Sequence, residues 1–406
     1  IVRLSSPNAN GISANTYSGG TTLSWGRVQI NSDAFFTGLA SAPTNIISSP
    51  FGTGSLTLRA IAGTSTLEAF GADRVVVNPM AATAYTINSS TTFFFAGRYS
   101  LNLANATQSV QLSTDGTLRS RTLQANNTTG ITTIAWGITQ GGTNGYNVVK
   151  TGAGLLQLSG TNTSANINGG DVNYGTSLFI DQGILRVSAD TSLGATAIGS
   201  LTGTSHNFGT SGTTSYPTDL RIRAATAGLV PTLQVAATSS FTTNRSIILS
   251  SNTAGGANID TMSGSALTLR TQTQGAFTLI KTGAGTLNLN PGSAPFGVGV
   301  NPHGTSVNAH NVLTIGGLAQ NNFTLNGVIN GRGVGGGVLA TQNVSGNPLI
   351  ASNGTVNVHG GTLLLNGAAA QTINLGATSI FNYGGGAYVQ INPATAPVAL
   401  TGVTTT

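Results

Sequence analysis

One short stretch occurs twice in the chain and constrains its fold more than any other feature. The five residues Lys-Thr-Gly-Ala-Gly stand at 150–154 and again at 281–285. A run that alternates between apolar and polar residues precedes and follows each copy, and such alternation is typical of a β-strand with two different faces. Glycine adopts backbone angles that other residues avoid. Each copy therefore predicts a tight corner between two strands.

A strand–corner–strand unit cannot bury its apolar face alone, because it needs the next copy stacked on it. We therefore predict one continuous β-solenoid over 1–406, a single elongated rod with loop excursions near 203–217 and 291–311. Three short strands and about 20 to 25 residues are expected in each coil. The segment 34–50 is less regular and contains two prolines, so we expect a loop or an expanded corner there.

The composition agrees with an all-β chain. Charged residues make up 6% of the sequence, against about 25% in an ordinary domain. Apolar residues make up 39% of the sequence and follow the strand pattern. The chain can therefore bury enough apolar surface to form a packed core, and disorder is not expected. The helix formers Glu, Lys and Met are scarce, whereas β-branched residues are common.

Several tracts resemble one family of bacterial proteins. The order of strands from 245 to 289 is similar to that of the autotransporter-associated β-strand repeat, and 15–30 resembles the core of that repeat. A weaker similarity lies at 183–190. The resemblance implies a right-handed parallel β-helix and a secreted passenger region at the bacterial cell surface. It implies little about activity.

We predict that the two corners are structural sites. The residues that we expect to form them are Lys150, Gly152, Gly154, Lys281, Gly283 and Gly285. At least one glycine of each corner is expected at positive φ, where a side chain is strained.

We predict that the protein is not an enzyme and that it has no catalytic, metal-binding or cofactor-binding residues. Solenoid enzymes that cleave polysaccharides use paired carboxylates or Ca²⁺, and no two of the nine acids lie within four residues of each other. Asp171 and Asp190 could meet on neighbouring coils, although both positions favour turns. The four histidines, His206, His303, His310 and His359, are scattered, and 331–336 matches a dinucleotide motif only in its letters.

Two further sequence patterns each allow two interpretations. The triplet Phe93-Phe94-Phe95 with Tyr99 favours a core stack of alternate rings, and the alternative is a stripe that binds carbohydrate or a partner. Arg119 with Arg121, and Arg221 with Arg223, each place two arginines on one strand face, which favours a solvated face; the alternative is weak contact with anionic polysaccharide or lipid. Basic residues are otherwise dispersed in a chain of net charge +6, so we expect no nucleic-acid binding. No apolar run is long enough for a transmembrane helix.

The two ends of the chain motivate the functional hypothesis. The chain begins at Ile1 without a signal segment, so we expect a processed product or a piece of a longer protein. Uncapped solenoid ends expose unpaired backbone groups. We therefore predict a polymer junction, with no cofactor, whose residues are Ile1, Val2, Arg3, Leu4, Val398, Leu400 and Val403.

The resulting prediction is a secreted structural protein of the bacterial cell surface or extracellular matrix. Its expected partner is a second copy of itself, stacked end to end into a fibre or sheath. The alternative is an autotransporter-type adhesin passenger that binds a host or carbohydrate surface. The absence of cysteine is compatible with a secreted chain held together by backbone ladders and core packing.

Overall fold

The structure is a computed structural model of the 406-residue chain. It describes residues 1–5, 12, 15–60, 65–80, 86–87, 92–107, 109–112, 120–140, 147–160, 177–194, 219–224, 230–243, 247–251, 257–269, 273–275, 279–289, 322–326, 338–342, 348–352, 355–359, 362–366, 371–375, 380–384, 388–392 and 398–401. The predicted excursions at 203–217 and 291–311 lie outside the described residues.

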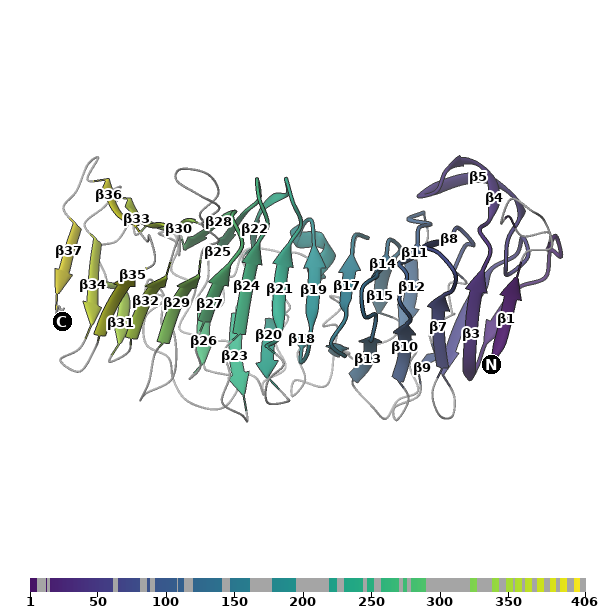
Figure 1. Ribbon diagram of the computed structural model, residues 1–406, viewed down its shortest axis with the longest axis horizontal. Helices are drawn as coiled ribbons and strands as arrows, with labels where there is room; N and C mark the ends of the chain where they lie inside the picture. The colour runs from purple at the N-terminus through teal and green to yellow at the C-terminus, as the bar shows by residue number, and fades with distance from the viewer. Residues whose placement is uncertain are drawn as a thin grey trace, which may run out of the picture. The chain divides into compact units, whose positions relative to one another are not determined.

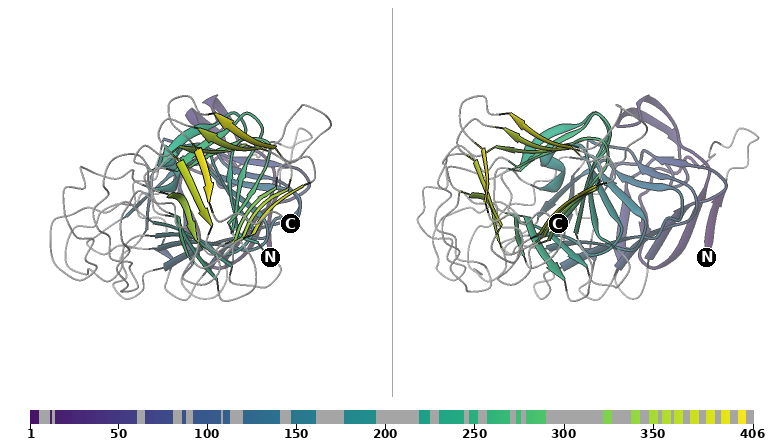
Figure 2. Two further views of the ribbon diagram at one scale, coloured as in Figure 1. Left: turned by 90° about the vertical axis from the view of Figure 1, so that its left-hand side faces the viewer. Right: turned by 60° about the vertical axis from the view of Figure 1, so that its left-hand side comes forward.

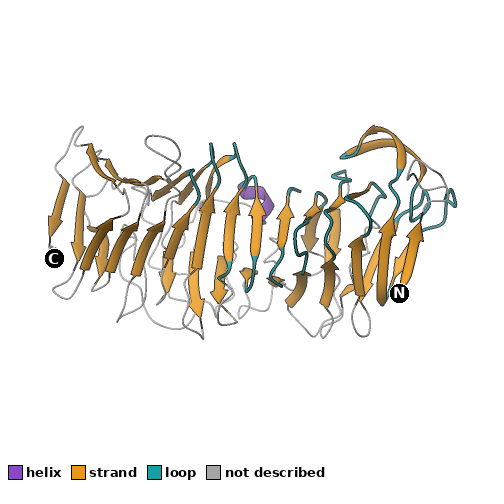
Figure 3. Ribbon diagram, in the orientation of Figure 1, coloured by secondary structure: helices purple, strands orange, loops and turns teal. Residues whose placement is uncertain are grey.

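The chain is all-β, as predicted, and divides into two compact units. Unit 1 contains Ile1–Val187 with Thr191–Ala195, and unit 2 contains Ser188–Asp190 with Thr196–Thr406. Apart from one 3-10 turn, η1 (Asp190–Leu193), every regular element among the described residues is a strand (Figure 3). The prediction of one continuous solenoid over 1–406 stays a prediction.

Unit 1 is built mainly from parallel sheets, and we call the stretch of chain from one strand of a sheet to the next a coil (Figure 1). In its first sheet the order is β1 (Val2–Ser5), β3 (Gly26–Asn31), β7 (Ser65–Ala69), β10 (Thr92–Ala96), β13 (Ser120–Ala125), β16 (Asn147–Thr151) and β18 (Ser177–Ile180). In its second sheet the order is β8 (Arg74–Val76), β11 (Leu101–Leu103), β14 (Ile131–Ile134), β17 (Leu155–Leu158) and β19 (Ile184–Val187). Shorter parallel sheets contain β2 (Thr21–Leu23), β6 (Leu56–Ala60) and β9 (Thr86–Ile87), and β12 (Ser109–Leu112) with β15 (Gly137–Gln140).

One antiparallel hairpin departs from this pattern. It consists of β4 (Phe35–Leu39) and β5 (Ala42–Ser48), and it is the one antiparallel pair among the described strands. At its tip the carbonyl oxygen of Ser41 accepts a hydrogen bond from the backbone N–H of Ala106, at 2.8 Å. The segment 34–50 forms a hairpin in place of the expected loop and expands its coil, as the alternative predicted; Pro43 pairs with Gly38, and Pro50 lies beyond the end of β5.

Unit 2 repeats the parallel arrangement with four sheets. The first contains β20 (Asp219–Ala224), β23 (Ile247–Ser251) and β26 (Thr273–Gly275). The second contains β21 (Thr232–Val235), β24 (Ala257–Thr261), β27 (Leu279–Thr282), β29 (Asn322–Asn326), β32 (Thr355–His359) and β35 (Ile380–Gly384). The third contains β22 (Ser240–Thr243), β25 (Ala266–Leu269), β28 (Thr286–Leu289), β30 (Val338–Gln342), β33 (Thr362–Asn366) and β36 (Tyr388–Asn392). The fourth contains β31 (Pro348–Ser352), β34 (Gln371–Leu375) and β37 (Val398–Thr401), and Figure 2 shows the yellow strands of the last three sheets as separate groups.

Side chains of successive coils stack in register inside unit 1. Phe95 pairs with Leu67 on one side and with Ala125 on the other, and all three are fully buried. The rings of Phe93 and Phe95 lie 5.1 Å apart between centroids, and Phe94 between them is half-buried. The prediction of a core stack of alternate phenylalanines is confirmed, and truncating one such ring to Ala would cost about 3 to 5 kcal/mol.

Some coils have the 20 to 25 residues that the sequence pattern predicts, and others are longer. Residues hydrogen-bonded across adjacent coils are separated by 24 positions for Thr282 and Asn258, and by 28 for the Asn127 side chain and the Tyr99 carbonyl oxygen. The separation rises to 39 for Gln29 and Glu68, in the coil that carries the β4–β5 hairpin. Turns therefore absorb the variation in length while the ladder keeps its register.

Candidate functional site

The first Lys-Thr-Gly-Ala-Gly stretch, 150–154, forms the turn between β16 and β17, and we call it the first corner. Gly152 has φ 77°, which confirms the expected positive φ. A Cβ at Gly152 would overlap the carbonyl oxygen of Ala125 in the preceding coil. The N–H of Gly154 donates to that same carbonyl oxygen at 2.8 Å. Glycine is therefore required by both the backbone angle and the close approach of the neighbouring coil.

Lys150 is a buried cation, which the corner interpretation did not predict. Its backbone pairs with Leu123 on one side and Ile180 on the other, both buried, so its side chain points into the core. Its Nζ donates to the carbonyl oxygens of Thr151 at 2.9 Å, Gly152 at 2.7 Å and Gln182 at 2.8 Å. These three acceptors match the three donors of an ammonium group.

Burial and hydrogen bonding oppose each other at Lys150. Only 1% of the residue is exposed, and this desolvation lowers the pKa of Lys150 to about 7 from 10.5. The three carbonyl oxygens favour the protonated amine, because a neutral amine has only two donors for them. Lys150 therefore acts as an internal donor to carbonyl groups of its own turn and of the neighbouring coil.

The second copy, 281–285, joins β27 to β28, and we call it the second corner. Gly283 has φ 76°, again as predicted, and a Cβ there would overlap the carbonyl oxygen of Thr261. The N–H of Gly285 donates to that oxygen at 2.8 Å. The backbone of Lys281 pairs with Ile259 and Leu325, and its side chain lies outside the described part of the structure.

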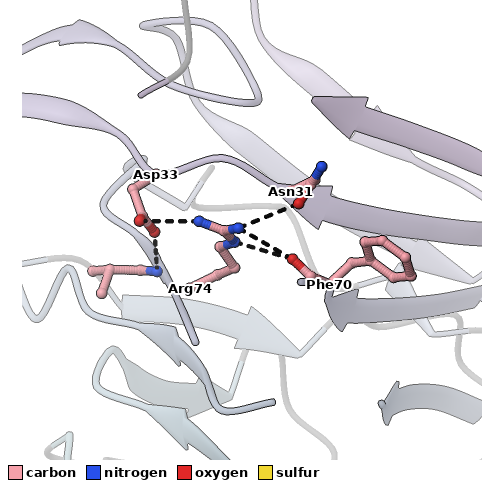
Figure 4. A network of polar contacts seen from close by, with 5 residues as sticks. Asn31, Asp33, Phe70 and Arg74 are labelled. Carbon is pink, nitrogen blue, oxygen red and sulfur yellow. Dashed lines mark hydrogen bonds and ion pairs between the residues drawn. The ribbon is translucent and has the colours of Figure 1, made fainter. Parts of the chain in front are cut away.

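A third corner of the same kind occurs at 70–74, between β7 and β8, and we call it the Phe70 corner (Figure 4). Gly71 has φ 78°. The guanidinium of Arg74 donates to the carbonyl oxygen of Phe70 through two nitrogens, each at 3.2 Å, and to Asn31 Oδ1 at 3.2 Å. It also forms an ion pair with Asp33 at 3.2 Å, and the other oxygen of Asp33 accepts the N–H of Val75 at 3.1 Å.

A second polar network lies on the first sheet of unit 1. Glu68 is 2% exposed, and its two carboxylate oxygens accept hydrogen bonds from Arg27 at 2.5 Å and from the Gln29 amide. Gln29 in turn accepts a hydrogen bond from Arg3 at 2.9 Å, and the Arg3 guanidinium lies 3.9 Å from the centre of the Phe70 ring. Because both oxygens of Glu68 are engaged, this arrangement is that of a structural ion pair.

The structure brings some of the predicted residues together and leaves others undescribed. Arg3 of the predicted junction belongs to the Glu68 network, whereas Ile1 and Val2 are 84% and 57% exposed. Val398 and Leu400 lie on β37. Asp190 begins η1. Outside the described residues lie Val403, Asp171, Arg119, His206, His303, His310 and the motif at 331–336.

Arg221 and Arg223 lie on one face of β20, as expected, because they alternate with the buried Leu220 and Ile222. Among the described residues, no three acidic or histidine side chains are grouped as metal ligands. In the same residues, no helix has the length and apolar character to span a membrane.

Exposed apolar side chains occur on the β4–β5 hairpin and at two positions that precede it in the sequence, and sequence reasoning missed them. Phe35, Leu39 and Ile47 of the hairpin are 48%, 72% and 38% exposed. Tyr17 is 48% exposed and Trp25 is 79% exposed. The sequence signal was present as a long stretch without charge, 34–58.

Comparison of the chain with protein-family models, curated proteins and solved structures finds no match. The resemblance to the autotransporter-associated β-strand repeat therefore stays a prediction.

Proposed function

We propose that this protein is a secreted structural protein of the bacterial cell surface or extracellular matrix. In this proposal the coils wind into one right-handed parallel β-helix, an elongated rod that associates end to end into a fibre or sheath. The proposal is supported by parallel sheets with a stacked core and by corners held through buried cations. Such ladders present the same backbone hydrogen bonds at every step, which suits a structural scaffold.

The observation that carries the proposal is the state of strand β1. It lies at the end of the first sheet and pairs with β3 through Val2–Ser5. Ile1 and Val2 are exposed, while Arg3 is held by Gln29 and by the Phe70 ring. In this proposal the edge of β1 that faces away from β3 pairs with a strand of a second copy. At the other end of the chain, β37 pairs with β34 and lies at the end of its sheet.

The proposal predicts concentration-dependent filaments. We expect chain 1–406 to sediment as a growing species and to form filaments visible by negative-stain electron microscopy. The variant Val2→Lys should abolish them, because a charge at the junction must be desolvated. The matched control is Val230→Lys, which places the same charge at a 41% exposed valine outside both end strands. A stable monomer at high concentration would refute the self-association.

A second candidate function, an adhesin that binds a host or carbohydrate surface, is favoured by one specific observation. Tyr17, Phe35, Leu39 and Ile47 expose apolar surface at one hairpin and its base. Exposed apolar clusters of this kind mark interaction sites. Binding of the labelled chain to intact cells tests this function, and it does not depend on filament formation.

A further inference from the structure

The β4–β5 hairpin carries an interaction surface whose composition indicates its ligand. We define the hairpin surface by six residues, Tyr17, Phe35, Thr37, Leu39, Thr44 and Ile47. We propose that the hairpin surface binds an uncharged polysaccharide. This inference rests on the second candidate function and names its ligand class.

Tyr17 belongs to the base of the hairpin, although it lies far from it in the sequence. The N–H of Ser49, next to the end of β5, donates to the carbonyl oxygen of Asn15 at 3.1 Å. The N–H of Thr53 donates to the carbonyl oxygen of Tyr17 at 2.8 Å, and a Cβ at Gly52 would overlap the Tyr17 ring. The Tyr17 ring therefore lies beside the turn that follows the hairpin.

The hairpin is anchored at both ends, so the surface is rigid before a ligand arrives. Phe35 pairs with Ser48 at its base, and Ser41 at its tip accepts the N–H of Ala106. A preformed surface loses less conformational entropy on binding than a mobile one.

The edges of the hairpin oppose strand addition, which leaves its faces for binding. Two irregularities in the register, at Phe35/Phe36 and at Thr37/Gly38, interrupt the ladder. Pro43 pairs with Gly38 and has no N–H to donate. Bulges and proline are the devices that prevent edge-to-edge pairing, so a second copy of this chain is disfavoured as the occupant.

The charge and polarity of the surface select the ligand. No charged residue occurs from 34 to 58, so the hairpin has no charged groups to attract an anionic or cationic partner. The hydroxyl groups of Thr37 and Thr44 lie 2.9 Å apart and are exposed beside apolar side chains. An uncharged sugar chain offers C–H faces for aromatic rings and hydroxyl groups for threonine, and so matches this mixture.

Retardation in native gels that contain mannan, dextran or hydroxyethyl cellulose tests the proposal with the full chain. We expect at least one of these polymers to retard the chain, and added salt to leave the effect unchanged. The double variant Phe35→Ser/Leu39→Ser should bind roughly tenfold more weakly, since it loses two anchors of the surface. Thr37→Ala/Thr44→Ala should weaken binding without changing the apolar surface. The matched control is Trp25→Ser, since Trp25 is 79% exposed but lies outside the hairpin surface.

Three outcomes would overturn the proposal. The first is no retardation by any of the three polymers, and the second is an equal loss in Trp25→Ser and in the hairpin variants. The third is a change of sedimentation in the hairpin variants without a change of retardation, which would make the hairpin an interface between copies. Cell binding separates the inference from the adhesin function. If the hairpin variants still bind cells, the adhesin function survives and the hairpin surface does not.

Discussion

The first corner and the Phe70 corner join the same two sheets of unit 1, yet each uses a different cation. Both contain Gly-Ala with the glycine at positive φ, 77° for Gly152 and 78° for Gly71. Lys150 donates to three carbonyl oxygens, whereas Arg74 donates to one carbonyl oxygen, one amide and the carboxylate of Asp33. The same backbone turn is therefore stabilised in two chemically distinct ways.

The two corners differ in the hydrogen-bond and ion-pair partners of the cation. Among the described residues, the hydrogen bonds of Lys150 go only to backbone carbonyls, and its burial lowers its pKa to about 7. Arg74 has a carboxylate partner, and the side chain of Asp33 is 42% exposed. Folding is coupled to the protonation of a buried cation that has no counter-ion. It is not coupled in this way for a cation that lies beside a hydrated carboxylate.

The glycines of the two corners should give the largest contrast. Gly152→Ala adds a Cβ against the backbone oxygen of Ala125, which cannot move without the ladder, so we expect a loss of about 3 to 4 kcal/mol. At Gly71 the nearest atom to a Cβ is the side-chain oxygen of Asn31, at 2.8 Å. Because that side chain can rotate, Gly71→Ala should cost about 1 to 2 kcal/mol. Urea unfolding measures both.

Two further substitutions separate the stability cost of backbone strain from the cost of steric overlap. Gly26 has φ 90° and no atom within 4 Å of a built Cβ, so Gly26→Ala should show strain alone, about 1 kcal/mol. At the second corner, Gly283→Val should lower the melting temperature strongly, because its side chain would overlap Thr261. An unchanged melting temperature there would show that the second corner is not constrained.

Removing the cations should give the next largest effect. Lys150→Met leaves three carbonyl oxygens without their donor, and we expect a loss of about 2 to 4 kcal/mol. Arg74→Met should cost about 1 to 2 kcal/mol, because Asp33 and Asn31 can be rehydrated. The free energies of unfolding of the two variants provide the comparison, and equal losses would contradict the distinction between the two corners.

A pH dependence should distinguish Lys150 from Arg74. Since burial lowers the pKa of Lys150 to about 7 from 10.5, the unfolded chain binds more protons than the folded chain between these values. The free energy of unfolding should then rise from pH 7 toward 10.5, by a few kcal/mol at most. Denaturant unfolding across this window should show the rise in the unsubstituted chain and in Arg74→Met, but not in Lys150→Met. The same slope in Lys150→Met would show that other groups cause the rise, whereas no rise in the unsubstituted chain would show that the carbonyl oxygens keep the amine protonated.

The smallest effect is expected from the counter-ion itself. Asp33→Asn removes a partly exposed ion pair and retains most of the hydrogen bonding, so we expect a loss of about 0.5 to 1 kcal/mol. Added salt should shrink this loss, because it screens the pair. The loss in Lys150→Met should be insensitive to salt, and a matching salt dependence there would reveal a carboxylate partner.

The sequence predicted the strands and corners because their signals are local. Alternation at Phe93–Phe95 and the paired glycines of the two corners determine strand faces and turn geometry directly. The role of Lys150 was missed because its three acceptors include Gln182, 32 residues away. The Glu68 network was missed for the same reason, since Arg27, Gln29 and Glu68 meet only after the coils stack.

The lengths of the longer coils were mispredicted, and the hairpin shows the reason for one of them. An alternating pattern shows where each strand lies in the sequence. It does not show how many residues separate two strands that pair in the sheet. In the coil from Gln29 to Glu68 the extra length includes β4 and β5. The absence of charge from 34 to 58 was the available signal of an exposed apolar element there.

The constant register of the ladder has a consequence for how such a chain can be remodelled. Rungs separated by 24, 28 or 39 residues stack in parallel sheets of the same kind. An insertion at a turn therefore leaves the pairing of the flanking strands intact, as the β4–β5 hairpin illustrates. Foreign sequence spliced in place of its tip at Ser41 would be displayed on an intact scaffold, and excision of the whole hairpin would leave a coil of ordinary length.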